Sequence, residues 1–381
     1  MNDLDLGATI KGFSQGQKIF GRYTLKRLLG RGGMGVVWLA RDDSLEREVA
    51  IKMLPEIVAN DPVAVKELKR ETAKSQRLSH PRILRTYDFV EAGALCGITM
   101  EYVEGGTLAA KRLEQPGEVF APETLAGWVR QLCEALEYAH REVQLVHRDL
   151  KPANLMLDRA GDLKVADFGI AASVSDSVSR VSQQAGSSGT PVYMSPQQMM
   201  GDKPAVTDDV YAMGATLYEL LTGKPPFHSG NIILQVQNKV PPGVNARRAE
   251  LGITAAPVPA AWESVIAACL AKEARDRPQS ALEVAEQLGL AARDSRGAIP
   301  PPATSPAVTA PVATPAPAPV SAPKPGKSRA PLFAAVAAVC VLAGAAGYYF
   351  AVYAPAREER RAAEQIRTVW EPARAMVLGR I

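Results

Sequence analysis

Cysteine is scarce in this sequence, and its few copies are widely separated. The four cysteines are Cys96, Cys133, Cys269 and Cys340, and they form no CxxC pair. Zinc sites and disulfide frameworks need cysteines at short, regular spacings, so we expect neither in this chain. This cysteine usage fits a protein that works in the reducing cytosol.

An excess of charge of one sign is also lacking. The chain has 44 basic and 40 acidic residues, which gives a formal net charge of +4. Proteins that bind nucleic acids usually carry a strong basic excess, so we expect no nucleic-acid partner. The first twenty residues lack a contiguous apolar run and carry Asp3, Asp5, Lys11 and Lys18, so we expect no cleavable signal peptide.

Residues 23–290 carry the apolar patterns of a globular domain, and the pattern changes period partway. Strand-like runs cover 23–28, 36–40, 49–53, 86–90 and 97–102, around one helical stretch near 62–78. After residue 102 the apolar spacing becomes helical. We predict a flexible lead-in over 1–22, a small β-rich lobe over 23–102 and a larger helical lobe over 103–290.

The composition changes again after the globular domain. Residues 300–325 contain ten prolines among small residues, so we predict an extended, disordered linker over 291–331. Residues 332–353 then carry no charge and can cross about 30 Å of hydrocarbon at about 1.5 Å per residue. We predict a transmembrane helix there, with a buried hydrophobic helix as the alternative, and a short tail over 354–381.

Three polar side chains flank two short predicted strands. Asp149 and Asn154 precede the strands at 155–157 and 163–165, and Asp167 follows them. The turn between the strands returns the chain, so we expect Asn154 and Asp167 to lie close together. Their oxygens suit a hard cation such as Mg²⁺, and a separate carboxylate at Asp149 can serve as a base. The spacing therefore favours metal-assisted phosphoryl transfer to a hydroxyl group.

A glycine-rich segment lies between two of the strand-like runs. Its residues are Gly30, Arg31, Gly32, Gly33, Met34 and Gly35. Glycines allow backbone amides to approach phosphates without interference from a Cβ atom. The residues that follow look like a strand, whereas a dinucleotide-binding turn needs a helix there, so we interpret the segment as a lid over phosphates.

One lysine, Lys52, lies at the end of the apolar run 49–52. A compact cation at this place suits the α- and β-phosphate oxygens of a nucleotide, provided that an acid holds it. Glu67 and Glu71 lie four residues apart on one face of the predicted helix. The spacing allows either of them to pair with Lys52, or both to be solvated.

Taken together in this order, the motifs resemble those of bacterial Hanks-type (eukaryotic-like) serine/threonine protein kinases, over about residues 23–290. The resemblance implies an α+β fold with two lobes and transfer of the γ-phosphate of ATP to protein hydroxyls, with Mg²⁺ or Mn²⁺ as the metal. It implies that Asp149 is the base, that Lys151 stabilises the transferred group, and that Asn154 and Asp167 hold the metal. It also favours Glu71 over Glu67 as the partner of Lys52.

The resemblance further implies which residues contact ATP. The backbone of Glu101 and Val103 would bond the adenine, and Met100 would be the gatekeeper. The other nucleotide-contacting residues would be Leu29, Gly30, Arg31, Gly32, Gly33, Met34, Gly35, Val37, Ala50, Lys52 and Met156.

The segment that would bind the acceptor protein contains Thr190. By resemblance, Thr190 with Lys151 is the pair typical of serine/threonine kinases rather than tyrosine kinases. Arg148 gives a phosphate on the preceding serine-rich loop a cationic partner, and such a pair orders a segment. We therefore predict autophosphorylation at Ser187, Ser188 or Thr190.

Three further positions are structural by resemblance. Asp209 would brace the catalytic loop, and Arg277 matches a late arginine of the family that usually pairs with a glutamate. This chain has Gln197 at the glutamate position. We expect a hydrogen bond in place of the ion pair, with a modest loss of stability and no loss of chemistry.

The resemblance and the predicted span together imply a kinase on the inner (cytoplasmic) membrane, with its catalytic domain in the cytoplasm. Basic residues before the span are Lys324, Lys327 and Arg329, and those after it include Arg357, Arg360, Arg361, Arg367 and Arg374. This charge distribution points slightly the other way, but ATP is cytosolic. A small-residue pair in the span, Ala343 and Gly347, is a weak indication of a homodimer, and the abundance of alanine and glycine explains it better.

Two alternatives remain within the same fold. An ATP-binding pseudokinase scaffold at the membrane would lack one of Lys52, Asp149, Asn154 and Asp167, and all four are present. A small-molecule kinase would lack the acceptor-binding segment at 189–196, which is also present. We therefore expect an active serine/threonine protein kinase.

Overall fold

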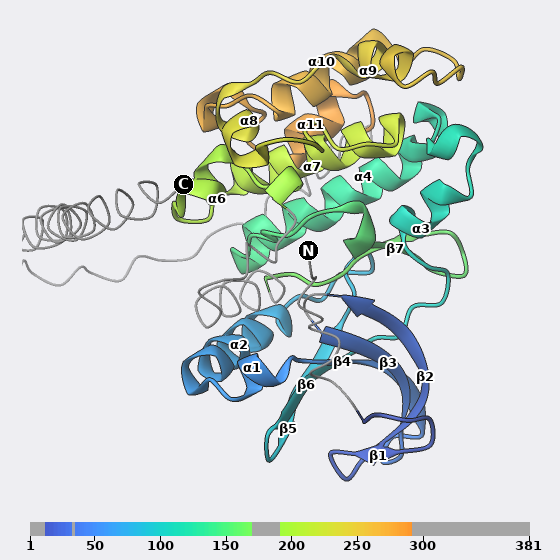
Figure 1. Cartoon of the computed structure of the whole chain (residues 1–381), viewed down its shortest axis with the longest axis vertical. Coiled ribbons are helices and arrows are strands. Elements are labelled where there is room, and N and C mark those ends of the chain that lie inside the picture. Colours follow the sequence, from blue (N-terminus) through green and yellow to red (C-terminus); the bar gives the residue numbers. More distant parts are fainter. Residues whose placement is uncertain (1–11, 33–34, 170–190, 292–381) are drawn as a thin grey trace, which may run out of the picture. The chain divides into compact units, whose positions relative to one another are not determined.

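A computed structural model describes residues 12–32, 35–169 and 191–291 of the chain (Figure 1). Gly33, Met34, the candidate phosphosites Ser187, Ser188 and Thr190, and everything after residue 291 lie outside the described residues. The predicted linker, membrane span and tail are therefore not described. Among the helices in the described ranges, none is long and apolar enough to cross a bilayer.

A six-stranded antiparallel sheet forms the small lobe, with strand order β1-β2-β3-β4-β6-β5. The strands are β1 (Lys18–Ile19), β2 (Tyr23–Gly32), β3 (Gly35–Asp42), β4 (Arg47–Met53), β5 (Thr86–Ala92) and β6 (Leu95–Met100). Figure 1 shows two helices beside the sheet, α1 (Glu56–Ala59) and α2 (Pro62–Ser75). Helix α2 begins where the Asp61 side chain accepts a hydrogen bond from the Val63 N–H, with proline at the first helical position.

The lead-in predicted over 1–22 is wrong for its last residues. Lys18–Ile19 pairs with β2, and Ile19 lies opposite Tyr23. Both side chains are buried in one apolar cluster, because Ile19 covers an edge of the sheet core that would otherwise face water. Two residues are too few for an alternating pattern to be visible in the sequence.

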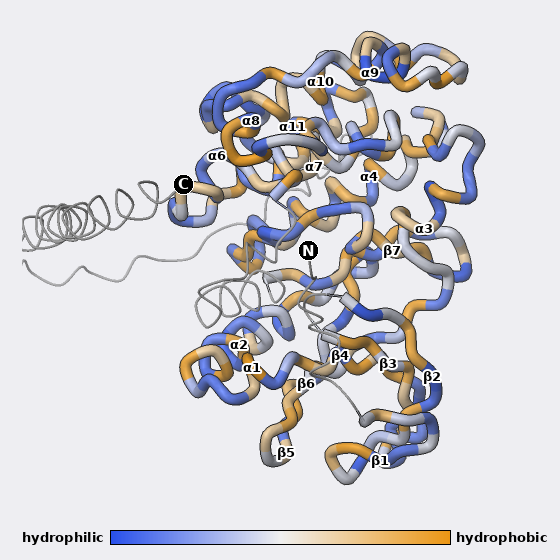
Figure 2. The backbone as a smooth tube through the Cα atoms, in the orientation of Figure 1, coloured by the Kyte–Doolittle hydropathy of each residue, from blue (hydrophilic) through white to orange (hydrophobic). Residues whose placement is uncertain are grey.

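The large lobe is mostly helical, as predicted. Its helices are α3 (Leu108–Leu113), α4 (Pro122–Tyr138), α6 (Pro196–Met200), α7 (Val206–Thr222), α8 (Ile232–Asn238), α9 (Val244–Glu250), α10 (Ala260–Cys269) and α11 (Ala281–Gln287). Short helical turns lie at 116–118, 139–143, 152–154, 191–193 and 274–276. Polar and apolar residues alternate along most of these helices (Figure 2), but α7 is buried on all sides from Thr207 to Thr222 and so forms the centre of the lobe.

A small antiparallel hairpin lies between the sheet and the helices. Its strands are β7 (Leu155–Leu157) and β8 (Leu163–Val165), which confirms the two strands predicted from the sequence. The hairpin packs against α4 and also meets the chain just after the small lobe: a Cβ on Gly105 would lie 2.2 Å from the carbonyl oxygen of Leu157. Only glycine permits that approach. The two-lobed fold expected from the resemblance is thus present.

Candidate active site

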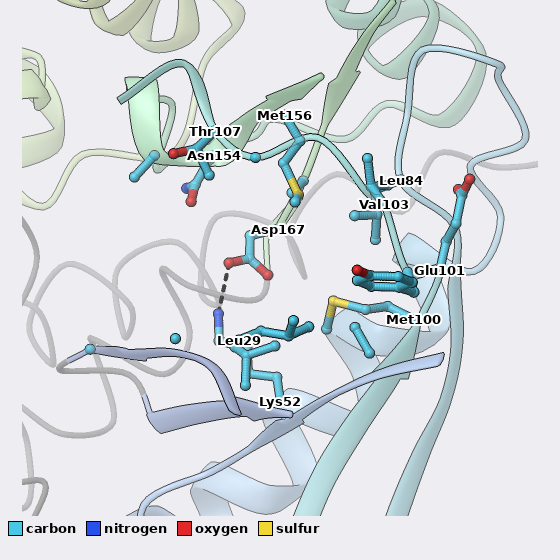
Figure 3. Close-up of a pocket in the computed structure, with 18 of the residues that line it drawn as sticks. Leu29, Lys52, Leu84, Met100, Glu101, Val103, Thr107, Asn154, Met156 and Asp167 are labelled. Atoms are coloured by element: carbon cyan, nitrogen blue, oxygen red, sulfur yellow. Dashed lines mark hydrogen bonds and ion pairs between the residues drawn. The ribbon is translucent and has the colours of Figure 1, made fainter. Parts of the chain in front are cut away.

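A cavity of about 750 Å³ lies between the small-lobe sheet and the β7–β8 hairpin (Figure 3). It is lined by most of the residues that were predicted to contact a nucleotide or a metal, namely Leu29, Gly30, Arg31, Gly32, Gly35, Val37, Ala50, Lys52, Met100, Glu101, Val103, Lys151, Asn154, Met156 and Asp167. The lining also includes residues that were not predicted to contact a ligand, namely Arg27, Leu84, Tyr102, Glu104, Gly105, Gly106, Thr107, Ala110, Ala153 and Ala166. The glycine pair Gly105 and Gly106, which follows β6 by five residues, was a sequence signal that could have pointed to part of this set.

Gly35 ends the glycine-rich turn on the cavity wall. Its φ is +119°, and a Cβ at this position would lie 2.0 Å from the carbonyl oxygen of Met53. Any other residue would therefore push β3 away from β4 at the point where Lys52 enters the cavity.

Lys52 and Asp167 meet across the cavity. Lys52 Nζ lies 2.8 Å from Asp167 Oδ2, and the lysine is only 5% exposed; Figure 3 marks this ion pair. Burial alone would raise the pKa of Asp167, but the charge and the hydrogen bond of Lys52 outweigh it, so the pKa lies below the usual aspartate value. Asp167 is therefore an ionised carboxylate that faces the cavity at neutral pH.

The ion pair predicted between Lys52 and Glu71 is not formed. Glu71 is buried, but its Oε1 accepts a hydrogen bond from Lys74 Nζ at 2.8 Å on the same helix. Lys74 lies one turn further along α2, so this local pair forms without moving the helix. A Cβ on Gly169 would lie 3.4 Å from Glu71 Oε2, so the carboxylate does reach the segment that follows Asp167. Asp167 holds Lys52 instead.

The hairpin brings Asn154 and Asp167 together, as predicted from the turn. The Ala166 N–H donates to the Asn154 carbonyl oxygen at 2.9 Å. The side-chain Nδ2 of Asn154 donates to the backbone oxygen and to Oδ2 of Asp149, at 2.7 and 3.0 Å. This leaves the amide Oδ1 of Asn154 without a hydrogen-bond partner among the described residues. One amide oxygen and one ionised carboxylate form a donor set that fits a hard divalent cation.

Asp149 is held by its neighbours rather than left mobile. Lys151 Nζ lies 3.0 and 2.8 Å from the two carboxylate oxygens of Asp149. With the amide of Asn154 this fixes the plane of the carboxylate. The two partners thus hold the Asp149 carboxylate in one orientation, in which its oxygens can accept a hydrogen bond from a hydroxyl group.

Asp209, at the start of α7, braces the loop that carries Asp149. It is fully buried, and its two oxygens accept the backbone N–H groups of His147 and Arg148, at 2.7 and 2.9 Å. His140 Nε2 bonds the same carboxylate at 2.7 Å. Burial would raise the pKa of Asp209, but the hydrogen bond and charge of His140 lower it below the usual value. Arg148 has a φ of +70°, a conformation that these contacts hold in place.

His147 was not assigned a role from the sequence, and the structure gives it one. Its Nε2 bonds the carbonyl oxygen of Ala166 at 2.8 Å, and its ring packs on Phe168 with centroids 4.6 Å apart. These contacts tie the catalytic loop to the residues on either side of Asp167. Asp167 itself has a φ of +63°.

Glu101 belongs to the segment that joins the lobes. Its N–H donates to the Arg85 carbonyl oxygen at 2.8 Å, which ties this segment to the residue before β5. Its side chain points away from the cavity (Figure 3) and pairs with Lys164 Nζ of β8 at 2.9 Å. This pair ties the segment to the hairpin that carries Asn154 and Asp167.

The predicted contact between Gln197 and Arg277 is present. Arg277 Nη2 donates to Gln197 Oε1 at 2.6 Å, and Gln197 Nε2 donates to the Lys272 carbonyl oxygen at 3.0 Å. The other guanidinium hydrogens go to the backbone oxygens of Thr207, Ala271 and Lys272. Arg277 therefore anchors α6 to α7 and to the turn before α11.

A second polar cluster near the catalytic loop was missed by the sequence analysis. Tyr193 donates a hydrogen bond to Glu219 of α7, and Arg112 Nη2 lies 3.7 Å from the other oxygen of that carboxylate. Burial raises the pKa of Glu219 above the usual glutamate value. The cluster fixes the start of the chain after Thr190, which itself lies outside the described residues.

The sequence matches a known family over most of its described length. Residues 23–288 match the family model described as "Protein kinase domain". Serine/threonine-protein kinase PknB of Mycobacterium tuberculosis is 38% identical over 277 residues, which are 70% of this chain and 42% of that protein. A probable serine/threonine-protein kinase of Streptomyces coelicolor, SCO3848, is 42% identical over 215 residues, 55% of this chain and 32% of that protein. This chain thus spans less than half the length of these relatives.

The fold is also similar to solved structures. The crystal structure of the PknI kinase domain of Mycobacterium tuberculosis matches with a TM-score of 0.58 at 28% sequence identity. The match covers 73% of this chain and 99% of that chain. The similarity therefore extends over a whole catalytic domain of that protein.

Proposed function

This chain belongs to the protein kinase family, and we propose that it transfers the γ-phosphate of ATP to serine and threonine hydroxyls of proteins. The observation that carries the proposal is that Lys52, Asn154 and Asp167 line one cavity of about 750 Å³, and that Asn154 also donates a hydrogen bond to Asp149 at 3.0 Å. A nucleotide-binding scaffold has no need for a fixed carboxylate beside a metal-binding donor set. The proposed protein substrates are of unspecified identity, and no nucleic-acid partner is proposed.

ATP would bind with its base against the segment 100–103 and its phosphates towards Lys52. The Glu101 carbonyl and the Val103 backbone would bond the adenine, and Ala50 and Met156 would enclose it. Lys52 would then bond phosphate oxygens, a contact for which it must share or leave Asp167. Asn154 and Asp167 would hold the divalent metal, which we infer to be Mg²⁺ with Mn²⁺ as a substitute, and which neutralises phosphate charge when bound.

Asp149 would orient the acceptor hydroxyl and take its proton. Lys151 donates to both of its oxygens, so the lysine lies beside the place where the acceptor oxygen and the transferred group meet. There it would stabilise the negative charge that spreads over the phosphoryl oxygens. The Arg277 anchor and the Tyr193 contact would support the segment that holds the acceptor protein.

The test is phosphate transfer from radiolabelled ATP by the full chain to a generic basic acceptor protein. Asp149→Asn keeps the shape of the side chain but removes the base, so labelling should fall by about 100-fold or more. Asp202→Asn is the matched control, because Asp202 is exposed and has no role in the site, and its labelling should equal that of the wild type. Equal labelling by Asp149→Asn would remove the assigned base, and no labelling by the wild type would favour the pseudokinase scaffold.

We further infer that the kinase phosphorylates its own activation segment, at Ser187, Ser188 or Thr190. The Arg148 guanidinium precedes the catalytic aspartate and would pair with such a phosphate. Digestion and mapping of the labelled chain from the same experiment tests this inference. Labelled peptides that exclude all three residues would contradict it.

Membrane anchoring through 332–353, and a homodimer that phosphorylates in trans, complete the proposed function.

A further inference from the structure

An irregularity in strand β2 brings an arginine onto the wall of the nucleotide cavity. Leu25 pairs with Ala40 and Arg27 with Leu39, so the residue between them, Lys26, has no partner in β3. Tyr23 and Leu25 point into the apolar cluster on one face of the sheet. Regular alternation would place Arg27 on that same face. The extra residue moves Arg27 to the cavity instead, as bulges beside binding sites commonly do.

Arg27 there contacts a residue 75 positions away. Its Nη2 donates to the hydroxyl of Tyr102 at 2.7 Å, and its guanidinium carbon lies 5.9 Å from the centroid of the Tyr102 ring. Tyr102 lies between Glu101 and Val103, in the segment proposed to bond the adenine. Both residues line the cavity. Arg27 is exposed and Tyr102 is half-buried, so the pair lies at the mouth of the cavity rather than in its depth.

The contact joins two parts of the site that must otherwise be ordered by the ligand. β2 runs directly into the glycine-rich turn, and Tyr102 belongs to the connection between the lobes. A contact that already holds β2 and this connection together in the free protein reduces the conformational entropy that is lost when a nucleotide binds. It also narrows the route by which the nucleotide leaves. The two residues touch neither the proposed metal ligands nor Asp149, so this restraint acts on binding and leaves the chemical step unchanged.

We propose that Arg27 and Tyr102 form a bridge that closes the outer end of the nucleotide cavity and slows the release of bound adenine nucleotides. This inference rests on the proposed function, because it assumes that ATP and ADP occupy the cavity. Arg27 and Tyr102 are positioning residues, and their effect is on the Kd for ADP and the KM for ATP.

The test compares three variants of the full chain with the wild type. Arg27→Gln removes the donor, Tyr102→Phe removes only the acceptor hydroxyl, and the double variant removes both. Lys26→Gln is the matched control, since it removes one positive charge from the same strand but pairs with Glu48 and does not line the cavity. ADP affinity and dissociation rate are measured directly with Mg²⁺ present, together with KM, kcat and the melting temperature of each unliganded variant.

Each single variant should weaken ADP binding and raise the KM for ATP by about three- to tenfold, with kcat within about twofold of the wild type. The double variant should bind ADP no more weakly than the more affected single variant, because each single variant already removes the same contact. Effects that multiply in the double variant, unchanged ADP release, or an equal effect of Lys26→Gln would overturn the bridge. A wild-type chain that fails to bind ADP would overturn the proposed function itself, so the two failures are distinguishable.

Discussion

Arg277 is a buried guanidinium whose acceptors are all neutral. It is 3% exposed and forms no ion pair within the described residues. Nearby, the Nζ of Lys272 is buried without a hydrogen-bond partner and lies 4.8 Å from the centre of the Phe227 ring. Burial, with a contribution from Arg277, lowers the pKa of Lys272 to about 8. Two cationic side chains therefore lie in one region, and no carboxylate among the described residues is bonded to either of them. The reason is that the position facing Arg277 carries the neutral Gln197 in place of a glutamate.

Gln197→Glu should raise the melting temperature by about 2–3 °C without changing turnover. The new carboxylate converts the bond from Arg277 into a charged pair, which contributes about 1 kcal/mol more than the present bond. The variant loses the hydrogen bond that Gln197 donates to the Lys272 carbonyl, and this loss limits the gain. Differential scanning calorimetry and steady-state kinetics measure the two effects.

A matched control isolates the lost hydrogen bond. Gln76 Nε2 also donates to a backbone carbonyl, that of Tyr87, at 2.7 Å, but Gln76 has no arginine partner. Gln76→Glu should therefore leave the melting temperature unchanged or lower it slightly. A melting temperature of Gln197→Glu at or below that of the wild type would show that the arginine gains nothing from the charge.

At the scale of elements, the parts predicted from the sequence were those with local patterns. The alternating apolar runs predicted five strands of the sheet. The turn at 158–162 predicted the β7–β8 hairpin, and this hairpin brings Asn154 close to Asp167. Family motifs gave the lining of the cavity. These signals are carried by residues close together in the chain or by short motifs.

The features that could not be predicted depend on competition between side chains for one partner, or on contacts between residues far apart in the chain. Lys74 competes with Lys52 for the carboxylate of Glu71. A pair three residues apart is common on exposed helix faces, so no sequence pattern favours Lys74 over Lys52 as the partner. The bulge at Lys26 leaves no mark in the apolar pattern of β2, and Tyr102 is 75 residues from Arg27. Sites that depend on a register shift are therefore visible only in the fold.

The brace between α7 and the catalytic loop should make stability depend on pH. The folded pKa of Asp209 lies below its unfolded value of about 3.9. A depressed carboxylate pKa contributes stability above the unfolded pKa, and this stability is lost as the pH falls through the folded pKa. Asp209→Asn should thus lower the free energy of unfolding by about 2 kcal/mol at pH 7, and by progressively less below about pH 4.

Urea denaturation of both proteins at pH 7, 5 and 3.5 checks this dependence. Asp88→Asn is the control, because Asp88 is exposed and its side chain makes no hydrogen bond to any residue that the structure describes. Its difference from the wild type should stay near zero. The free energy of unfolding of Asp209→Asn could instead differ from that of the wild type by the same amount at all three pH values. This result would contradict the prediction, because the loss of stability would then not come from the charge of the carboxylate.

At the scale of the whole molecule, the proposed catalytic residues and the proposed membrane anchor lie in separate parts of the chain. The proposed catalytic residues, Thr190 apart, lie in the described residues between 23 and 291, with no helix there that could cross a bilayer. The uncharged run at 332–353 follows ten prolines at 300–325. An extended linker of this length, at about 3.1 Å per residue, would let the catalytic domain reach substrates roughly 80 Å from the proposed anchor.

The full chain should therefore sediment with membranes and resist extraction by alkaline carbonate, because a span of 22 uncharged residues is released only by detergent. Val341→Lys with Ala345→Lys places two charges near the centre of the run, each at a cost of about 2.5–3.5 kcal/mol, and should move the protein to the soluble fraction. Val308→Lys with Ala313→Lys is the control, since the same charges in the linker leave the span intact. The double variant in the span should keep its kinase activity. Carbonate extraction of the wild-type chain would instead place 332–353 outside the bilayer, and the kinase would then reach the membrane, if at all, through a partner.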